Sequence, residues 1–130
     1  MDMGKEARSD IGIFDINLDT GQWTWSYELK DLFGIPRDAD LNFQLVLERV
    51  HPEDRRGFNA LALEPFRPDC PSRTTRRFRI VRPDGSVHWL HLVRMTLFRE
   101  GATRDAFRIL GFAVEISAPM GSPGPWEIAA

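Results

Sequence analysis

Alternating hydrophobic and polar positions around one turn predict a β-hairpin in the second half of the chain. Residues 76–93 read RRFRIVRPDGSVHWLHLV, and the tripeptide Pro-Asp-Gly at 83–85 separates two β-prone runs. Proline sets φ for the first corner of a turn, and glycine accepts the left-handed conformation at its end. If the tripeptide forms a type I turn followed by a glycine bulge, Phe78 lies opposite Leu90.

This register gives the two faces of the hairpin different chemistry. Ile80 and Leu92 join the first pair on an aliphatic face. The opposite face carries Arg77, Arg79, Trp89 and His91. A two-residue Asp-Gly loop would instead place Trp89 beside Phe78 and Ile80. We favour the first register because it separates an aliphatic face from a basic, aromatic one, and it sets Arg79 opposite Trp89 for a cation–π contact.

The remaining pattern predicts strands, then helices, then strands. Strands are bounded by turn residues, while the helices have apolar residues at helical spacing and capping signals at Ser26 and Gly34. The other predicted elements are strands at 11–18 and 22–25, a helix between Ser26 and Gly34, helices at 41–50 and from 52 to 62 or 63, an extension of the hairpin to Phe98, and a last strand at 107–116. The order β-β-α-α-α-β-β-β predicts an α+β fold with an antiparallel sheet.

Composition limits the class of protein without naming a function. The chain has 130 residues, 42% of them hydrophobic, and a formal net charge of −2, which fits one soluble globular domain. This balance gives no electrostatic attraction to nucleic acid or anionic membrane. No stretch approaches 18 consecutive apolar residues, and residues 1–10 lack an apolar signal core, so we expect a cytoplasmic protein.

Five short motifs, in this order, resemble those of the PAS sensory domain, in the branch that has a PAC-type C-terminal half. Each motif is weak alone, but the combination is specific because it spans residues 11–117. The motifs are Trp25-Ser26 before a helix that ends in Leu32-Phe33-Gly34-Ile35, then Val50-His51-Pro52-Glu53-Asp54-Arg55, Phe78-Arg79-Ile80, Pro83-Asp84-Gly85-Ser86 followed by Trp89, and Leu110-Gly111-Phe112-Ala113-Val114-Glu115-Ile116-Ser117.

The resemblance implies a five-stranded antiparallel sheet with helices packed on one face and a pocket between them. It implies a sensory module of a larger bacterial-type regulator, such as a histidine kinase, a diguanylate cyclase or a transcription regulator. We therefore expect a flexible segment at 1–10, a PAS domain at 11–117 and a Pro/Gly-rich tail at 118–130 that contains Trp126. Whether the chain is an excised domain or acts alone on a partner stays open.

The resemblance also implies which side chains face the pocket, and the strand members agree with the register chosen above. The implied ligand-binding set is Phe43, Val46, Phe58, Phe78, Ile80, Leu90, Leu92, Ile109, Gly111 and Ala113. Two interpretations stay open. Either Gly111 and Ala113 leave room for a ligand, or large side chains such as Phe78 and Phe112 fill the space.

The outer sheet face is implied to meet a flanking helix or a second subunit. The expected interface is Arg77, Arg79, Trp89 and His91, and the expected signal junction is Glu115, Ile116 and Ser117. We therefore expect a homodimer that relays a signal to an effector domain or a partner signalling protein and does not itself bind nucleic acid. The alternative is a small-molecule or cofactor receptor that uses the apolar pocket.

The chemistry-bearing residues argue against several cofactors and against catalysis. The flavin branch of the family needs a cysteine within an Asn-Cys-Arg type motif on a helix, whereas Cys70, the single cysteine, lies in the Pro-rich segment 65–71. Haem needs an axial ligand, and the resemblance makes His51 a turn residue. His88 and His91 lie on opposite faces of one strand, so they predict no metal site. Glu53 and Asp54 fit a helix start, and no catalytic set is predicted.

Overall fold

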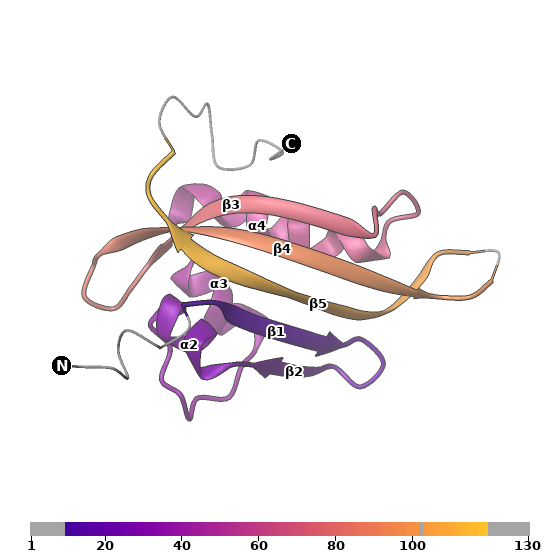
Figure 1. Ribbon diagram of the computed structural model, residues 1–130, viewed down its shortest axis with the longest axis horizontal. Helices are drawn as coiled ribbons and strands as arrows, with labels where there is room; N and C mark the ends of the chain where they lie inside the picture. The colour runs from indigo at the N-terminus through magenta and orange to yellow at the C-terminus, as the bar shows by residue number, and fades with distance from the viewer. Residues whose placement is uncertain (1–9, 102, 120–130) are drawn as a thin grey trace.

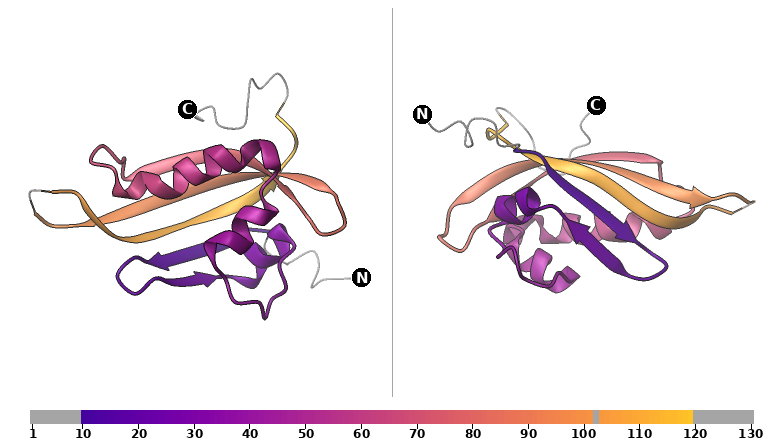
Figure 2. Two further views of the ribbon diagram at one scale, coloured as in Figure 1. Left: turned by 180° about the vertical axis from the view of Figure 1, so that it is seen from behind. Right: turned by 60° about the horizontal axis from the view of Figure 1, so that its bottom comes forward.

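The computed structural model describes residues 10–101 and 103–119 and confirms the predicted α+β fold. The antiparallel sheet has the strand order β2-β1-β5-β4-β3 (Figure 1). The helices cover one face of this sheet (Figure 2). In chain order the elements are β1 (Gly12–Asn17), β2 (Gln22–Trp25), α2 (Tyr27–Phe33), α3 (Phe43–Arg49), the 3-10 turn η1 (Pro52–Asp54), α4 (Arg55–Leu63), the 3-10 turn η2 (Glu64–Phe66), β3 (Arg73–Val81), β4 (Val87–Arg99) and β5 (Asp105–Ile116).

The hairpin of β3 and β4 has the predicted register. Phe78 pairs with Leu90, and Arg79 pairs with Trp89. Gly85 has a φ of 86°, and its N–H donates to the carbonyl of Arg82 at 2.8 Å, as a glycine-closed turn requires. The guanidinium of Arg79 lies 5.5 Å from the centroid of the Trp89 ring, so the predicted cation–π contact is confirmed.

The predicted caps bring the first helix onto the sheet. The Ser26 hydroxyl accepts from the Leu29 N–H at 3.3 Å and from the Ile13 N–H at 2.9 Å, so it caps α2 and fixes α2 to β1. Gly34 ends the helix with a φ of 71°. A Cβ at Gly34 would lie 2.7 Å from the ring of Pro83, so glycine also permits the hairpin turn to approach.

The predicted helix from 52 to 63 is divided in the structure. Pro52–Asp54 forms the turn η1, and the α-helix begins only at Arg55. The reason is local: His51 Nδ1 accepts from the Glu53 N–H at 3.1 Å, and the Asp54 side chain turns away to the sheet. In the segment after it, Glu64–Phe66 forms a second 3-10 turn.

Two expectations concern residues for which the structure gives no description. The flexible segment at 1–10 has only Asp10 within the described range, and most of the tail at 118–130, with Trp126, lies beyond it. Within the described residues, no helix is long and apolar enough to cross a membrane.

Candidate functional site

A cavity of about 280 Å³ lies between the sheet and the helices. Its wall is almost entirely apolar because side chains two apart on each strand point to the same face, and that face is covered by α2, α3 and α4. The sheet side is lined by Phe14, Ile16, Leu18, Trp23, Trp25, Leu92, Arg94 and Ile109, and the helix side by Leu29, Phe33, Phe43, Val46, Phe58, Leu61, Ala62 and Phe66. Phe66 is 65% exposed, so the wall reaches the molecular surface at η2.

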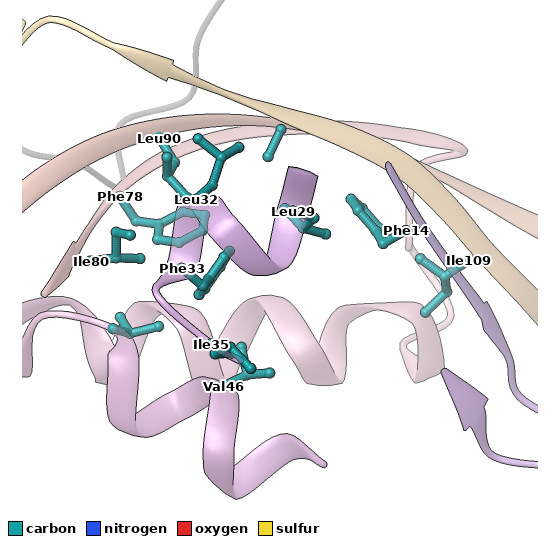
Figure 3. Packing of buried hydrophobic residues seen from close by; sticks show 12 residues of the cluster. Phe14, Leu29, Leu32, Phe33, Ile35, Val46, Phe78, Ile80, Leu90 and Ile109 are labelled. Atoms are coloured by element: carbon teal, nitrogen blue, oxygen red, sulfur yellow. The ribbon is translucent and has the colours of Figure 1, made fainter. Parts of the chain in front are cut away.

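The structure divides the implied ligand-binding set into two groups. Phe43, Val46, Phe58, Leu92 and Ile109 line the cavity. Phe78, Ile80, Leu90 and Ala113 have no exposed surface and lie in the packed core beside it, off the cavity wall. We call the first region the cavity end and the second the packed end of the helix-covered face. Figure 3 shows Phe78, Ile80 and Leu90 grouped at one end, with Phe14 and Ile109 at the other.

Gly111 provides no room for a ligand on the helix side of the sheet. A Cβ there would lie 2.0 Å from the Val93 carbonyl oxygen and 2.8 Å from the ring of Phe14. The ring of Phe14 therefore occupies the space that the absent side chain leaves. Ala113 is likewise enclosed, and neither position is part of the cavity wall. Of the two interpretations left open, filling by side chains describes Phe78 at the packed end, whereas Phe112 is 39% exposed on the outer face and does not fill the space. A cavity persists at the cavity end.

Sequence reasoning missed several residues of the cavity wall. Phe14 and Ile16 alternate along β1, and Trp23 and Trp25 alternate along β2. Their rings stack with centroids 6.5 Å apart, and Trp25 also lies 4.9 Å from the Phe33 ring. The alternation along β1 and β2 indicated that these apolar side chains share one face of the sheet. Only the position of β1 and β2 beside β5 decided that this face borders the cavity.

Arg94 is the one charged residue among those described along the cavity wall. Its side chain is only 6% exposed. Its Nη1 donates to the Leu61 carbonyl at 2.7 Å, and its Nη2 donates to Glu64 at 2.8 Å. Glu64 also accepts from Thr74 at 2.9 Å and from Arg76 at 3.3 Å. Burial lowers the pKa of Arg94, and the nearby Glu64 carboxylate partly opposes this. Sequence reasoning gave Arg94 no role.

The Asp54 carboxylate joins α4 to the edge strand β3. It is fully buried and accepts the Arg79 N–H at 2.8 Å, the Arg79 Nε–H at 3.0 Å and the Arg79 Nη2–H at 2.7 Å. The bonds from its guanidinium to Asp54 raise the pKa of Arg79. Arg55 donates to the Val50 and Glu48 carbonyls at 3.0 and 3.2 Å and so closes the end of α3. The motif at 50–55 therefore has a structural task at the packed end.

The predicted interface residues form one corner of the outer sheet face. Arg77 pairs with His91 beside the Arg79–Trp89 pair. Arg79, however, also reaches over the strand edge to Asp54, so it is a structural residue as well. Burial and then the neighbouring Arg77 and Arg73 lower the pKa of His91.

The largest exposed hydrophobic side chains of this face lie next to that corner, on β1, β4 and β5. Ile13 is 57% exposed and Phe112 39% exposed, and the two are paired across β1 and β5. Phe112 also pairs with Val93 of β4. We call the exposed side chains Ile11, Ile13, Met95 and Phe112 the outer patch. The predicted interface residues Arg77, Arg79, Trp89 and His91 lie beside this patch and are not members of it.

The predicted signal junction is connected to the hairpin turn. His88 Nδ1 lies 2.7 Å from one carboxylate oxygen of Glu115, and Arg82 donates to the other at 3.3 Å. The Arg82 Nε–H also donates to the Leu32 carbonyl at 3.0 Å, at the end of α2. Glu115 at the end of β5 is thus linked to both the hairpin and a helix, while Ile116 ends the strand and Ser117 follows it.

Cys70 and His51, which were considered for cofactor chemistry, are not part of the cavity wall. Cys70 is buried, donates to the Pro71 carbonyl at 3.2 Å and is not part of the cavity wall. His51 caps η1, as a turn residue should. Among the described residues, no group of three or more His, Cys, Asp or Glu side chains is arranged to hold a metal ion.

Comparison with known proteins identifies relatives of this chain. A family model described as the PAS fold matches residues 22–113. The chain is 28% identical over 107 residues to "Probable diguanylate cyclase DgcE" of Escherichia coli (strain K12), and the match covers 82% of this chain. The chain spans only 9% of the length of that relative.

Solved structures share the fold. The N-terminal domain of a diguanylate cyclase with PAS/PAC sensor from Marinobacter aquaeolei has a TM-score of 0.67 at 18% identity, over 81% of this chain and 94% of that one. The sensory box histidine kinase/response regulator from Burkholderia thailandensis E264 has a TM-score of 0.61 at 21% identity, over 82% of this chain and 77% of that one. With its sheet order, its helix-covered cavity and a family match over most of its length, the chain belongs to the PAS fold family of signal-transduction sensor domains.

Proposed function

We propose that this domain is the sensory input module of a larger regulator and that the cavity receives its signal, a small molecule whose larger part is apolar. The observation that carries the proposal is a cavity of about 280 Å³ whose wall is made of aliphatic and aromatic side chains. Ligand sites are concave, mostly apolar and equipped with few polar groups, as this one is. The five implied residues on its wall, Phe43, Val46, Phe58, Leu92 and Ile109, are the proposed ligand contacts.

The regulator is proposed to carry a histidine kinase or diguanylate cyclase output. The support is that similar chains come from proteins with those names. In this proposal the domain performs no catalysis, works in the cytoplasm and passes its signal through Glu115 to Ser117. The bonds from Glu115 to His88 and Arg82 support this route, because a ligand that moves the helices also alters these contacts.

Native mass spectrometry and an absorption spectrum of freshly purified protein test the cavity. The expected result is a mass excess from a bound ligand. If the protein carries no ligand, an added apolar probe such as 2-naphthalenemethanol is expected to bind and to quench the fluorescence of Trp23 and Trp25. Ala62→Leu fills the cavity from α4 and is expected to abolish probe binding. Ala60→Leu, at an exposed position of the same helix, is the matched control. A bare polypeptide mass together with no probe binding would contradict the proposal.

A second function, self-association, is favoured by the outer patch. Exposed apolar side chains that cluster on one face mark an interaction surface. We propose that a second copy of the chain covers the patch, because a two-fold dimer brings the same apolar side chains of both copies together. The corner residues Arg77, Trp89 and His91 would then form the polar rim of the interface.

Light scattering during size-exclusion chromatography tests this association. Phe112→Glu places a charge in the centre of the outer patch and is expected to convert a dimer to a monomer. Leu63→Glu is the matched control, because Leu63 is 63% exposed on α4, on the helix side of the sheet. A dimer that survives Phe112→Glu, or a wild-type monomer at micromolar concentration, would contradict a dimer through this face.

A further inference from the structure

The cavity wall combines two chemistries that together specify a ligand class. Seven of the sixteen wall residues are aromatic. Trp23 stacks on Trp25, and Phe43 stacks on Phe58 with ring centroids 6.0 Å apart. The guanidinium-bearing side chain of Arg94 is part of this otherwise apolar wall and extends from β4 toward α4.

Arg94 has hydrogen-bonding capacity that the protein does not use. An arginine carries five N–H donors, and none of them can be given up by deprotonation. Nη1 and Nη2 have partners in Leu61 and Glu64. Nε is buried and has no hydrogen-bond partner among the described residues. Leaving a buried charged donor without an acceptor is costly, so this group favours a ligand that supplies an oxygen atom.

The charge around Arg94 favours an anion over a neutral acceptor. Glu64 is the carboxylate that faces Arg94, and it is shared with Arg76 at 3.3 Å. Two guanidinium groups thus surround one carboxylate, which leaves one positive charge in excess. A ligand carboxylate neutralises this excess in a site where burial weakens competition from water.

The size of the cavity limits the apolar part of the ligand. A cavity of about 150 Å³ lined by Leu, Ile and Phe is enough for benzene. A volume of about 280 Å³ therefore suits one or two rings. The stacked aromatic pairs offer flat surfaces, against which rings pack in offset or edge-to-face geometry.

We propose that the cavity binds an aromatic monocarboxylate of one or two rings, whose rings lie against Trp25, Phe43 and Phe58 and whose carboxylate accepts from Arg94. This inference rests on the proposed sensory function of the cavity and adds the chemistry of the signal. The carboxylate uses the free Nε–H, and the Glu64 contact holds the rest of the guanidinium in place.

Two probes with the same rings test the charge preference in the wild-type domain. Isothermal titration calorimetry compares 2-naphthoate with 2-naphthalenemethanol, which has the same ring system without the charge. The expected result is that 2-naphthoate binds at least about tenfold more tightly, as one charge-assisted hydrogen bond provides. Equal affinity, or tighter binding of the alcohol, overturns the carboxylate inference and leaves the cavity proposal intact. Binding of neither probe by protein that has a bare polypeptide mass overturns both.

Variants assign the preference to Arg94. Arg94→Met is expected to remove the tenfold preference while the alcohol still binds. Arg67→Met is the control, because Arg67 follows η2 but has an exposed side chain and is not part of the cavity wall. A preference that persists in Arg94→Met, or disappears in Arg67→Met, contradicts the assignment.

A measurement on the wild type remains decisive if Arg94→Met does not fold. In a proton–nitrogen NMR spectrum of the wild type, the Arg94 Nε–H resonance is assigned through its covalently bonded side-chain atoms. The expected result is a larger downfield shift with 2-naphthoate than with 2-naphthalenemethanol, because both probes bring the same rings and only 2-naphthoate brings a charged acceptor. An unchanged resonance at saturating 2-naphthoate overturns the inference.

Discussion

The packed end and the cavity end lie on the same face of one sheet and are built from the same kinds of apolar side chain. At the packed end, backbone meets backbone: Val50 forms a bridge with Ile80, and the His51 N–H donates to the Arg79 carbonyl at 2.9 Å. At the cavity end, the link from β4 to α4 runs through the long side chain of Arg94 to the Leu61 carbonyl. The two ends therefore differ in this link, which runs through backbone atoms at the packed end and through a side chain at the cavity end.

The comparison shows that apolar composition does not decide whether a core is filled. Protein interiors are close-packed where the chain permits the layers to approach. Phe78 fills its place against the Phe33 ring, at 6.2 Å between centroids, whereas the stacked rings of Phe43 and Phe58 border an open volume. The position of the helices above each end therefore separates core from candidate site.

The largest expected effect comes from removing a ring at the packed end. Phe78→Ala deletes a fully buried side chain, and loss of such a ring costs about 3–5 kcal/mol of unfolding free energy. Phe43→Ala, at the partly exposed cavity wall, is expected to cost about 1 kcal/mol. Urea denaturation measures both free energies of unfolding. Equal losses would remove the distinction between the two ends.

Weakening the ion pair between Asp54 and Arg79 is expected to have the next largest effect on the free energy of unfolding. Asp54→Asn weakens a buried ion pair, and leaving the guanidinium without its charged partner is expected to cost about 3 kcal/mol of unfolding free energy. Glu53→Gln is the neighbouring control, because Glu53 is exposed and its ion pair with Arg79 is expected to contribute less than about 1 kcal/mol. Thermal unfolding of both variants in parallel checks this. If the control is as damaging as Asp54→Asn, burial is not the cause.

One matched pair of substitutions tests free volume directly. Ala113→Leu adds the same atoms as Ala62→Leu, but Ala113 has no space beside it. Overpacking at Ala113 is expected to cost about 2 kcal/mol of unfolding free energy. Ala62→Leu is expected to be neutral or slightly stabilising, because Ala62 faces the cavity. The comparison fails if chemical denaturation shows the two variants to be equally destabilised.

The smallest expected effect is the pH dependence that His91, on the outer sheet face, gives to the free energy of unfolding. This dependence should be the same in variants of the packed end and of the cavity end. Burial and the arginines Arg77 and Arg73 hold the pKa of His91 below its ordinary value. The unfolded chain therefore binds this proton more readily than the folded domain. Stability is fully present above about pH 6.5 and falls as the pH drops from there through the folded pKa. His91→Asn should flatten that part of a stability–pH curve, and an unchanged slope would exclude His91 as its source.

Local rules accounted for much of the fold because they act over a few residues. The turn at 83–85, the Ser26 cap and the Gly34 stop each need only neighbouring atoms, and the hairpin register followed from the turn and the alternation. The resemblance supplied the sheet, and half of the implied pocket residues reached the cavity wall.

The rest depended on segments that are distant in sequence. Asp54 meets Arg79 across 25 positions, and Arg94 meets Leu61 across 33. A pattern of period two predicts which face a residue lies on, but not what stands above it.

The amino-acid sequence by itself determined the order of elements, the hairpin register and the family, because turns, caps and alternation are local. Only the tertiary structure decided that Phe78 is core, that Phe14 occupies the space beside Gly111, and that Arg94 borders a cavity. The physical reason is that the distance between sheet and helices is set by contacts between remote segments. Whether a residue fills the core or borders the cavity depends on that distance.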